Sequence, residues 1–103
     1  MTTSGNRVTV ISIVRHLQKE LSGLVELDSL SEEQEYQLDS IGRTVEVLMR
    51  VAENVNDRRL YDILDDFEYG VNETSMGAPG KAAYELAKTE AKIQELERTH
   101  SEE

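Results

Sequence analysis

The sequence predicts an all-α protein, a small helical bundle of three core helices plus a C-terminal helix. Two observations support this: apolar residues recur at steps of three and four along most of the chain, which is the spacing of one helix face, and only one segment resembles a strand. With 103 residues the chain fits a single core. That core must come from Val, Leu and Ile, because the chain has one Phe, four Tyr and no Trp.

The first helix is expected to begin near Val10 and to end near Gly23. Its apolar face has helical spacing and consists of Val10, Val14, Leu17, Leu21 and Leu24. The β-branched residues 8–14 could form a strand instead. A helix is preferred because no other segment could pair with that strand.

The second helix carries the strongest pattern in the chain. Ser31 and Gln34 match a capping box at its start. A heptad pattern of apolar residues follows, formed by Leu38, Ile41, Val45, Leu48, Ala52 and Val55. Gly42 interrupts this helix and is interpreted mainly as tolerated, with close approach of another helix as the alternative.

A third, shorter helix should be capped by Asn56 or Asp57 and should end at Gly70. Its apolar face is formed by Leu60, Ile63, Leu64 and Phe67. Residues 1–69 are therefore expected to form the helical core, and residues 70–80, rich in Gly, Ser and Pro, a flexible linker. In residues 81–103 we expect a C-terminal helix up to Arg98, either isolated or stabilised by a partner, and then a disordered tail.

Charge is concentrated in the middle of the chain. Of the formal net charge of −10, residues 26–69 carry −9, from thirteen acids and four bases. Helical spacing places four of these acids on one side of the second helix, and they are the predicted partner-binding residues: Glu32, Glu35, Asp39 and Glu46. Such a strip favours a basic protein partner. The alternative is a solvated face that only maintains solubility.

Several functional classes are not expected. The negative charge disfavours nucleic acid and anionic membrane surfaces. The chain has no Cys, and its two His residues, His16 and His100, are far apart, so we expect no metal, no cofactor and no enzyme activity. The acids Asp62, Asp65, Asp66 and Glu68 lack the ligand spacing of a calcium loop. No signal peptide is recognisable, and we expect a cytoplasmic protein.

A homodimer is expected from the small size of the apolar core. The residues predicted to form either the intramolecular core or the dimer interface are Val14, Leu17, Leu21, Leu38, Ile41, Val45 and Leu48. The sequence alone does not choose between these two roles.

The middle of the chain resembles the N-terminal dimerisation domain of the small glutamine-rich tetratricopeptide-repeat co-chaperones. The residues that carry the resemblance are Leu30-Ser31 at the start of the long helix, Leu38-Asp39 and Val45-Glu46 within it, and Leu60, Ile63, Leu64 and Phe67 in the third helix. Gln37, Ser40-Ile41 and Arg43-Thr44 differ from the family pattern, and the chain contains no tetratricopeptide repeats.

The resemblance implies a homodimer whose acidic second helix binds a ubiquitin-like domain in the targeting of tail-anchored membrane proteins. The contacts carried over would be Glu32, Glu35, Asp39 and Glu46, with Arg43 among them. Charge alone is equally compatible with an acidic inhibitor or nucleic-acid mimic that acts on a basic target. A small structural subunit of a larger complex is the third possibility.

Overall fold

The computed structural model describes the backbone of residues 2–102 and the side chains of residues 7–99. Over this part of the chain there are four helices and no strand, which confirms the all-helical prediction. The helices are α1 (Thr2–Val25), α2 (Glu32–Asn54), α3 (Arg58–Ser75) and α4 (Pro79–Glu102). Short connections join them, as is usual between antiparallel neighbours.

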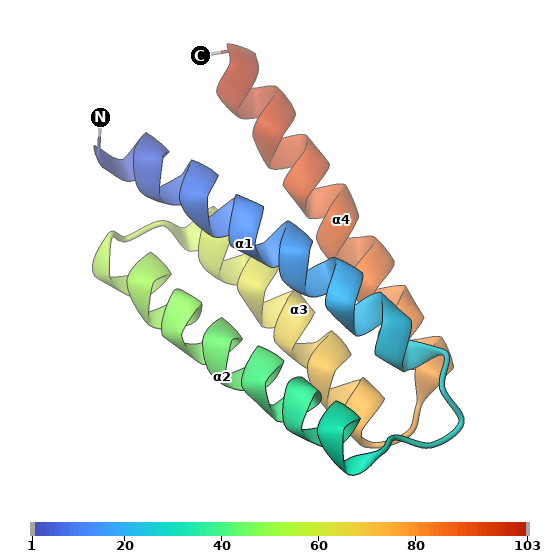
Figure 1. Cartoon of the computed structure of the whole chain (residues 1–103). Coiled ribbons are helices and arrows are strands. Elements are labelled where there is room, and N and C mark those ends of the chain that lie inside the picture. Colours follow the sequence, from blue (N-terminus) through green and yellow to red (C-terminus); the bar gives the residue numbers. More distant parts are fainter. Residues whose placement is uncertain (1, 103) are drawn as a thin grey trace.

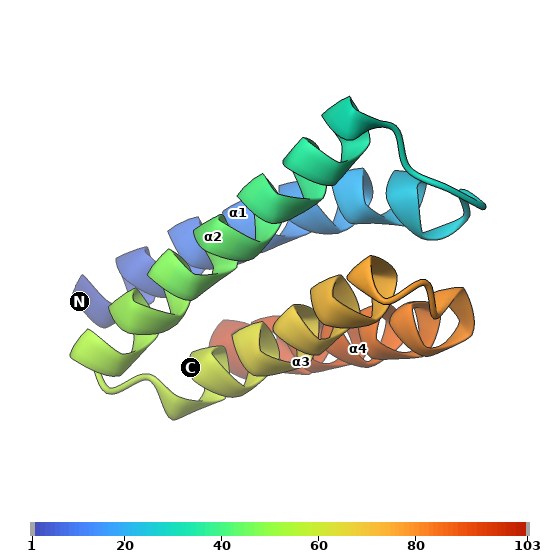
Figure 2. The same ribbon diagram turned by 90° about the horizontal axis from the view of Figure 1, so that it is seen from below.

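The helices run alternately up and down and form an elongated bundle of 44 × 22 × 17 Å. Figure 2 shows α1 and α2 as one layer and α3 and α4 as the other. Each helix packs against the next along the chain, and α1 also contacts α3 and α4. The spaces between α2 and α3 and between α1 and α4 therefore lie on opposite sides of the bundle.

The core follows the predicted apolar faces. Phe67 is fully buried at its centre. The predicted apolar residues of α1 and α3 are all buried, and so are those of α2 except Val55, which is half-buried. The residues beside the heptad pattern of α2 divide, with Met49 buried, Val51 partly buried and Val47 57% exposed. One broad stripe of α2 thus packs on the bundle.

Capping residues explain where the helices begin and end. The capping box at Ser31 and Gln34 is confirmed, with each side chain bonded to the other's backbone N–H. The side chain of Asp57 caps α3 by accepting from the Leu60 N–H at 3.2 Å. Asn56 instead follows the C-terminal end of α2, where its φ of 56° lies in the left-handed region.

The prediction that Gly70 ends α3 is wrong. A Cβ at Gly70 would lie 3.6 Å from the Cβ of Glu85, so this glycine lies inside the helix where α4 approaches closely. α3 continues to Ser75, and Gly77, with a φ of 74°, takes the left-handed position after it. The Ala78 N–H donates to the Glu73 carbonyl at 2.9 Å, which completes a Schellman motif.

The expected linker is therefore largely structured: residues 70–75 are helical, and only residues 76–78 connect α3 to α4. α4 is not an isolated helix, because it packs along α3 and buries Ala82, Thr89, Ile93 and Leu96. The bundle thus has four core helices where three were expected. The helix also continues through most of the expected disordered tail, to Glu102, while Glu103 lies outside the described residues.

The sequence signal for α4 was weak because two of its buried positions, Ala82 and Thr89, are small or polar. Thr89 is fully buried, and its hydroxyl donates to the Glu85 carbonyl at 2.8 Å. Thr74 on α3 donates to the Gly70 carbonyl at 2.8 Å in the same way. Because each hydroxyl is hydrogen-bonded within its own helix, these two polar side chains can be buried where α3 and α4 pack.

Candidate protein-binding trough

The four predicted partner-binding acids are all exposed on α2. Glu35, Asp39 and Glu46 line one groove between α2 and α3. Glu32 lies in the first turn of α2 and does not line that groove. The structure therefore brings three of the four acids together.

The groove has an apolar floor and polar walls. Leu38 and Val71 are both buried, and Gly42 lies between the two helices without a side chain to fill the space. A Cβ at Gly42 would lie 3.6 Å from Val71 Cγ1, an ordinary contact distance. A methyl group at Gly42 would therefore fit, in contact with Val71 of α3. The remaining polar lining comes from Arg43 on α2 and from Asn72 and Ser75 on α3.

The groove carries uncompensated negative charge. Arg43 pairs with Asp39, with Nε 3.0 Å from Oδ2, and both side chains are exposed. Glu35 and Glu46 have no ion pair with any described residue. An exposed pair such as Asp39–Arg43 contributes little stability, so Arg43 reduces the net charge of the groove without closing it.

Glu68 extends this charge onto α3, a role that the sequence reasoning missed. Partial burial, followed by the negative charges of Glu46 and Asp65, raises the pKa of the Glu68 carboxyl. Glu68 therefore adds negative charge beside Glu46. The signal was present in the sequence, because Glu68 is three residues before Val71 and so lies on nearly the same side of α3.

The groove continues into a second one at the end of the bundle where α1 connects to α2 and α3 to α4. The two grooves share Leu30, Glu35 and Ser75. We refer to both together as the trough. The second part is lined by residues of the α1–α2 connection and of the α3–α4 turn: Leu24, Val25, Glu26, Leu27, Asp28, Ser29, Thr74, Gly77, Ala78 and Pro79. Within the trough, five acids face one base, Arg43.

Asp66 of α3 is directed away from the groove. Asp66 is buried and faces α4, where its Oδ2 lies 2.5 Å from Lys92 Nζ and its Oδ1 lies 3.7 Å from Lys88 Nζ. The hydrogen bond to Asp66 is the main cause that raises the pKa of Lys92. This carboxylate is therefore part of the α3–α4 packing and is unavailable to a partner.

The predicted core or interface residues are all buried within the single chain. They are Val14, Leu17, Leu21, Leu38, Ile41, Val45 and Leu48, each with at most 7% of its surface exposed. In this structure they pack α1 and α2 into the bundle.

The candidate metal-ligating side chains do not assemble. Among the described residues, no group of three or more His, Asp or Glu side chains could hold a metal ion. His16 is exposed, and its Nε2 lies 2.8 Å from Oε1 of Glu20. The side chain of His100 lies outside the described residues.

Within residues 2–102, no helix is long and apolar enough to cross a membrane.

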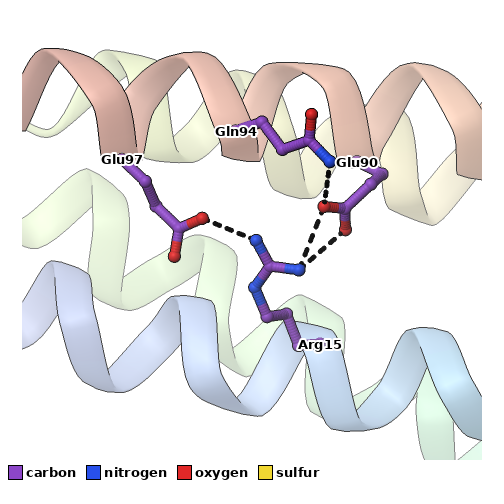
Figure 3. A network of polar contacts seen from close by, with 4 residues as sticks. All are labelled: Arg15, Glu90, Gln94 and Glu97. Atoms are coloured by element: carbon purple, nitrogen blue, oxygen red, sulfur yellow. Dashed lines mark hydrogen bonds and ion pairs between the residues drawn. The ribbon is translucent and has the colours of Figure 1, made fainter.

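On the opposite side of the bundle, a groove between α1 and α4 is lined mainly by Val8, Ile11 and Leu96. Its charges are mostly used within the chain. Figure 3 shows Arg15 between two acids of α4, with Nη1 3.0 Å from Glu90 and Nη2 2.6 Å from Glu97. Among the described residues that line this groove, the charged side chains are paired within the chain, so no free charge remains there to select a partner.

Comparison of the chain with protein-family models, with curated proteins and with solved structures found no significant match.

Proposed function

We propose that this protein is a non-enzymatic protein-binding module whose trough receives a basic segment of a partner protein. The observation that supports this most directly is the convergence of Glu35, Asp39 and Glu46 on one groove with an apolar floor. Interfaces of this composition gain affinity from the apolar centre and selectivity from the charged rim.

The electrostatics support a cationic ligand. Glu35 and Glu46 have no counter-ion among the described residues, and Glu68 adds a third acid that its neighbours repel. A Lys or Arg placed between Glu46 and Glu68 would relieve that repulsion. Part of the binding free energy would then come from repulsion already present in the free protein.

The position of the acids along a groove that also has apolar lining favours a protein ligand over the alternative of nucleic-acid mimicry. A mimic must present its charges outward to fill a basic groove on the target. Here the acids form the walls of a groove that itself accepts a ligand. The ubiquitin-like partner implied by the resemblance is one basic partner of this class, and any homodimer would use a surface other than the buried core residues.

The test is a charge reversal with a matched control. The trough variant carries Glu35→Lys, Asp39→Lys and Glu46→Lys, and the control carries Glu33→Lys, Glu53→Lys and Glu95→Lys, which are exposed acids outside the trough. Both change the net charge equally. Each full-length variant is used as bait in an extract of the native host, and proteins crosslinked to α2 or α3 are quantified by mass spectrometry.

The trough variant should lose partner capture by about tenfold or more, and capture by the unaltered chain should fall with rising salt. The control variant should retain its partners. Equal capture by all three proteins would refute the proposal, and so would an equal loss in both variants, because that loss would reflect total charge alone. Circular dichroism checks that the variants keep their helical content.

A further inference from the structure

The acidic wall of the trough is long enough to accompany about three turns of a helical ligand. The wall extends along α2 from Glu35 to Glu46, which at the rise of an α-helix is about 16 Å, or about three turns. Beyond Glu35 the trough continues past Leu30 into its second part, where Leu27 is 41% exposed. A ligand that followed the trough would therefore run along α2 and α3.

The floor of the groove between α2 and α3 is apolar and could contact apolar side chains of a ligand. Gly42 contributes no side chain, and beside it Leu38 and Val71 line the groove with the 6% of each residue that stays exposed. Together with Leu27 in the second part of the trough, which is 41% exposed, this gives apolar positions in both parts of the trough. Apolar side chains spaced at i, i+4 and i+7 on one helix face match such a track.

The two walls of the groove differ in charge, and this difference indicates which flank of the ligand should be basic. The α2 wall carries Glu35, Asp39 and Glu46, while the α3 wall presents the neutral Asn72 and Ser75 beside the groove. A ligand with Lys and Arg along one flank of its apolar stripe would pair with the α2 wall. Its other flank would meet the uncharged Asn72 and Ser75, and Glu68 is the acid that α3 contributes near Glu46.

From this shape and charge we propose that the occupant of the trough is a basic amphipathic helix of a partner protein, which lies along α2 and α3 with an apolar side chain over Gly42. This inference rests on the proposed function and specifies its ligand. A folded domain that binds through a flat surface would contact the exposed acids but would not fill the space above Gly42.

The experiment selects ligands without assuming a sequence. A phage-displayed library of random peptides, long enough for four helical turns, is panned against the full chain, and the enriched peptides are synthesised with a fluorescent label. Binding is followed by anisotropy to the unaltered protein, to Gly42→Leu and to Gly23→Leu. Gly23 is the matched control because it is helical and exposed, with no neighbouring atom within 4 Å of a Cβ placed on it.

Enriched peptides should carry several Lys or Arg residues beside an apolar stripe of helical period, and they should gain helical circular dichroism on binding. Gly42→Leu should weaken binding about tenfold, and Gly23→Leu should leave it unchanged. In nuclear magnetic resonance spectra of the unaltered protein, peptide should shift the signals of Gly42 and Val71 and leave Gly23 in place. These spectra keep the test valid if Gly42→Leu folds poorly.

The inference is overturned if the library yields no binding peptide, if the peptides bind in an extended form, or if Gly42 and Val71 do not shift. If the native partner is lost on reversal of Glu35, Asp39 and Glu46 but retained by Gly42→Leu, the proposed function stands and the helical occupant is wrong. If reversal of the three acids leaves both the peptides and the native partner bound, both proposals fail.

Discussion

Arg7 and Asp57, which are fifty residues apart in the sequence, form a bidentate ion pair at one end of the bundle. Arg7 Nε lies 2.8 Å from Oδ2 of Asp57, and Nη2 lies 2.9 Å from Oδ1. The same Oδ1 accepts from the Leu60 N–H at the start of α3. The Asp57 side chain is only 2% exposed, so one buried carboxylate joins α1 to the α2–α3 connection.

Asp57→Ala should therefore destabilise the protein strongly. The substitution removes the cap of α3 and leaves the guanidinium of Arg7, 18% exposed, without this partner. We expect a loss of about 3 kcal/mol in the free energy of unfolding, measured by urea denaturation. The control is Asp39→Ala, which breaks an exposed pair and should cost less than about 1 kcal/mol. Similar losses in the two variants would contradict the structural role of the buried pair.

The same carboxylate makes stability dependent on pH. Burial alone would raise the pKa of Asp57, but its hydrogen bonds from Arg7 and the Leu60 backbone outweigh burial and lower it. Because the folded pKa lies below the unfolded value, this contribution is complete above the ordinary aspartate pKa of 3.8 and is lost as the pH falls through the folded pKa. Denaturation at a series of acidic pH values should show a smaller pH dependence in Asp57→Asn; an unchanged slope would contradict this.

Glu68→Gln should have the opposite sign. Burial and the charges of Glu46 and Asp65 raise the pKa of Glu68, so its ionisation in the folded protein costs stability. That cost appears as the pH rises from the ordinary glutamate pKa of 4.5 through the folded value. At neutral pH the variant should be more stable by about 0.5 kcal/mol, and the gain should vanish below pH 4.5. Destabilisation at neutral pH would show that Glu68 is not repelled.

Arg15→Met tests the bridge between α1 and α4 in Figure 3. Arg15 reaches both Glu90 and Glu97, but the side chains are partly exposed, which limits the strength of the pairs. We expect a loss of about 0.5–1 kcal/mol at low salt, and a smaller loss near 1 M salt because exposed charges are screened. A loss that does not depend on salt would mean that the arginine stem, and not its charge, stabilises the contact.

Gly70 should tolerate Ala but not Leu. The atoms nearest to a Cβ at this position lie 3.6–3.8 Å away, so a methyl group fits and gains helix propensity. A Leu side chain would push α4 away and should cost about 1–3 kcal/mol in the free energy of unfolding. Gly23→Leu, at an open helical position, is the control and should not destabilise the protein. Tolerance of Leu at Gly70 would show that α3 and α4 pack less closely than described.

Most of the candidate site could be predicted, but not its shape. The period of α2 placed Glu35, Asp39 and Glu46 on one side, and the structure puts them in one groove. It could not show that Glu32 falls outside that groove or that Glu68 of α3 approaches Glu46. Those relations depend on the rotation and position of α3 relative to α2, which a helical period does not specify.

The sequence by itself determined that the chain is helical, the cap at Ser31, and the apolar faces of α1, α2 and α3, because capping and periodicity are local properties of the chain. It left the cap of α3 open between Asn56 and Asp57, and it placed the start of the first helix near Val10, whereas α1 begins at Thr2. Only the tertiary structure decided that Gly70 lies inside a helix and that α4 completes the core. The physical reason is that a glycine suits both a helix end and a close contact between helices. The sequence alone does not show which residues of another helix pack against it. Here the close approach of Ala82, Glu85 and Leu86 to Gly70 leaves room for a small residue only, so the glycine serves packing and does not end the helix.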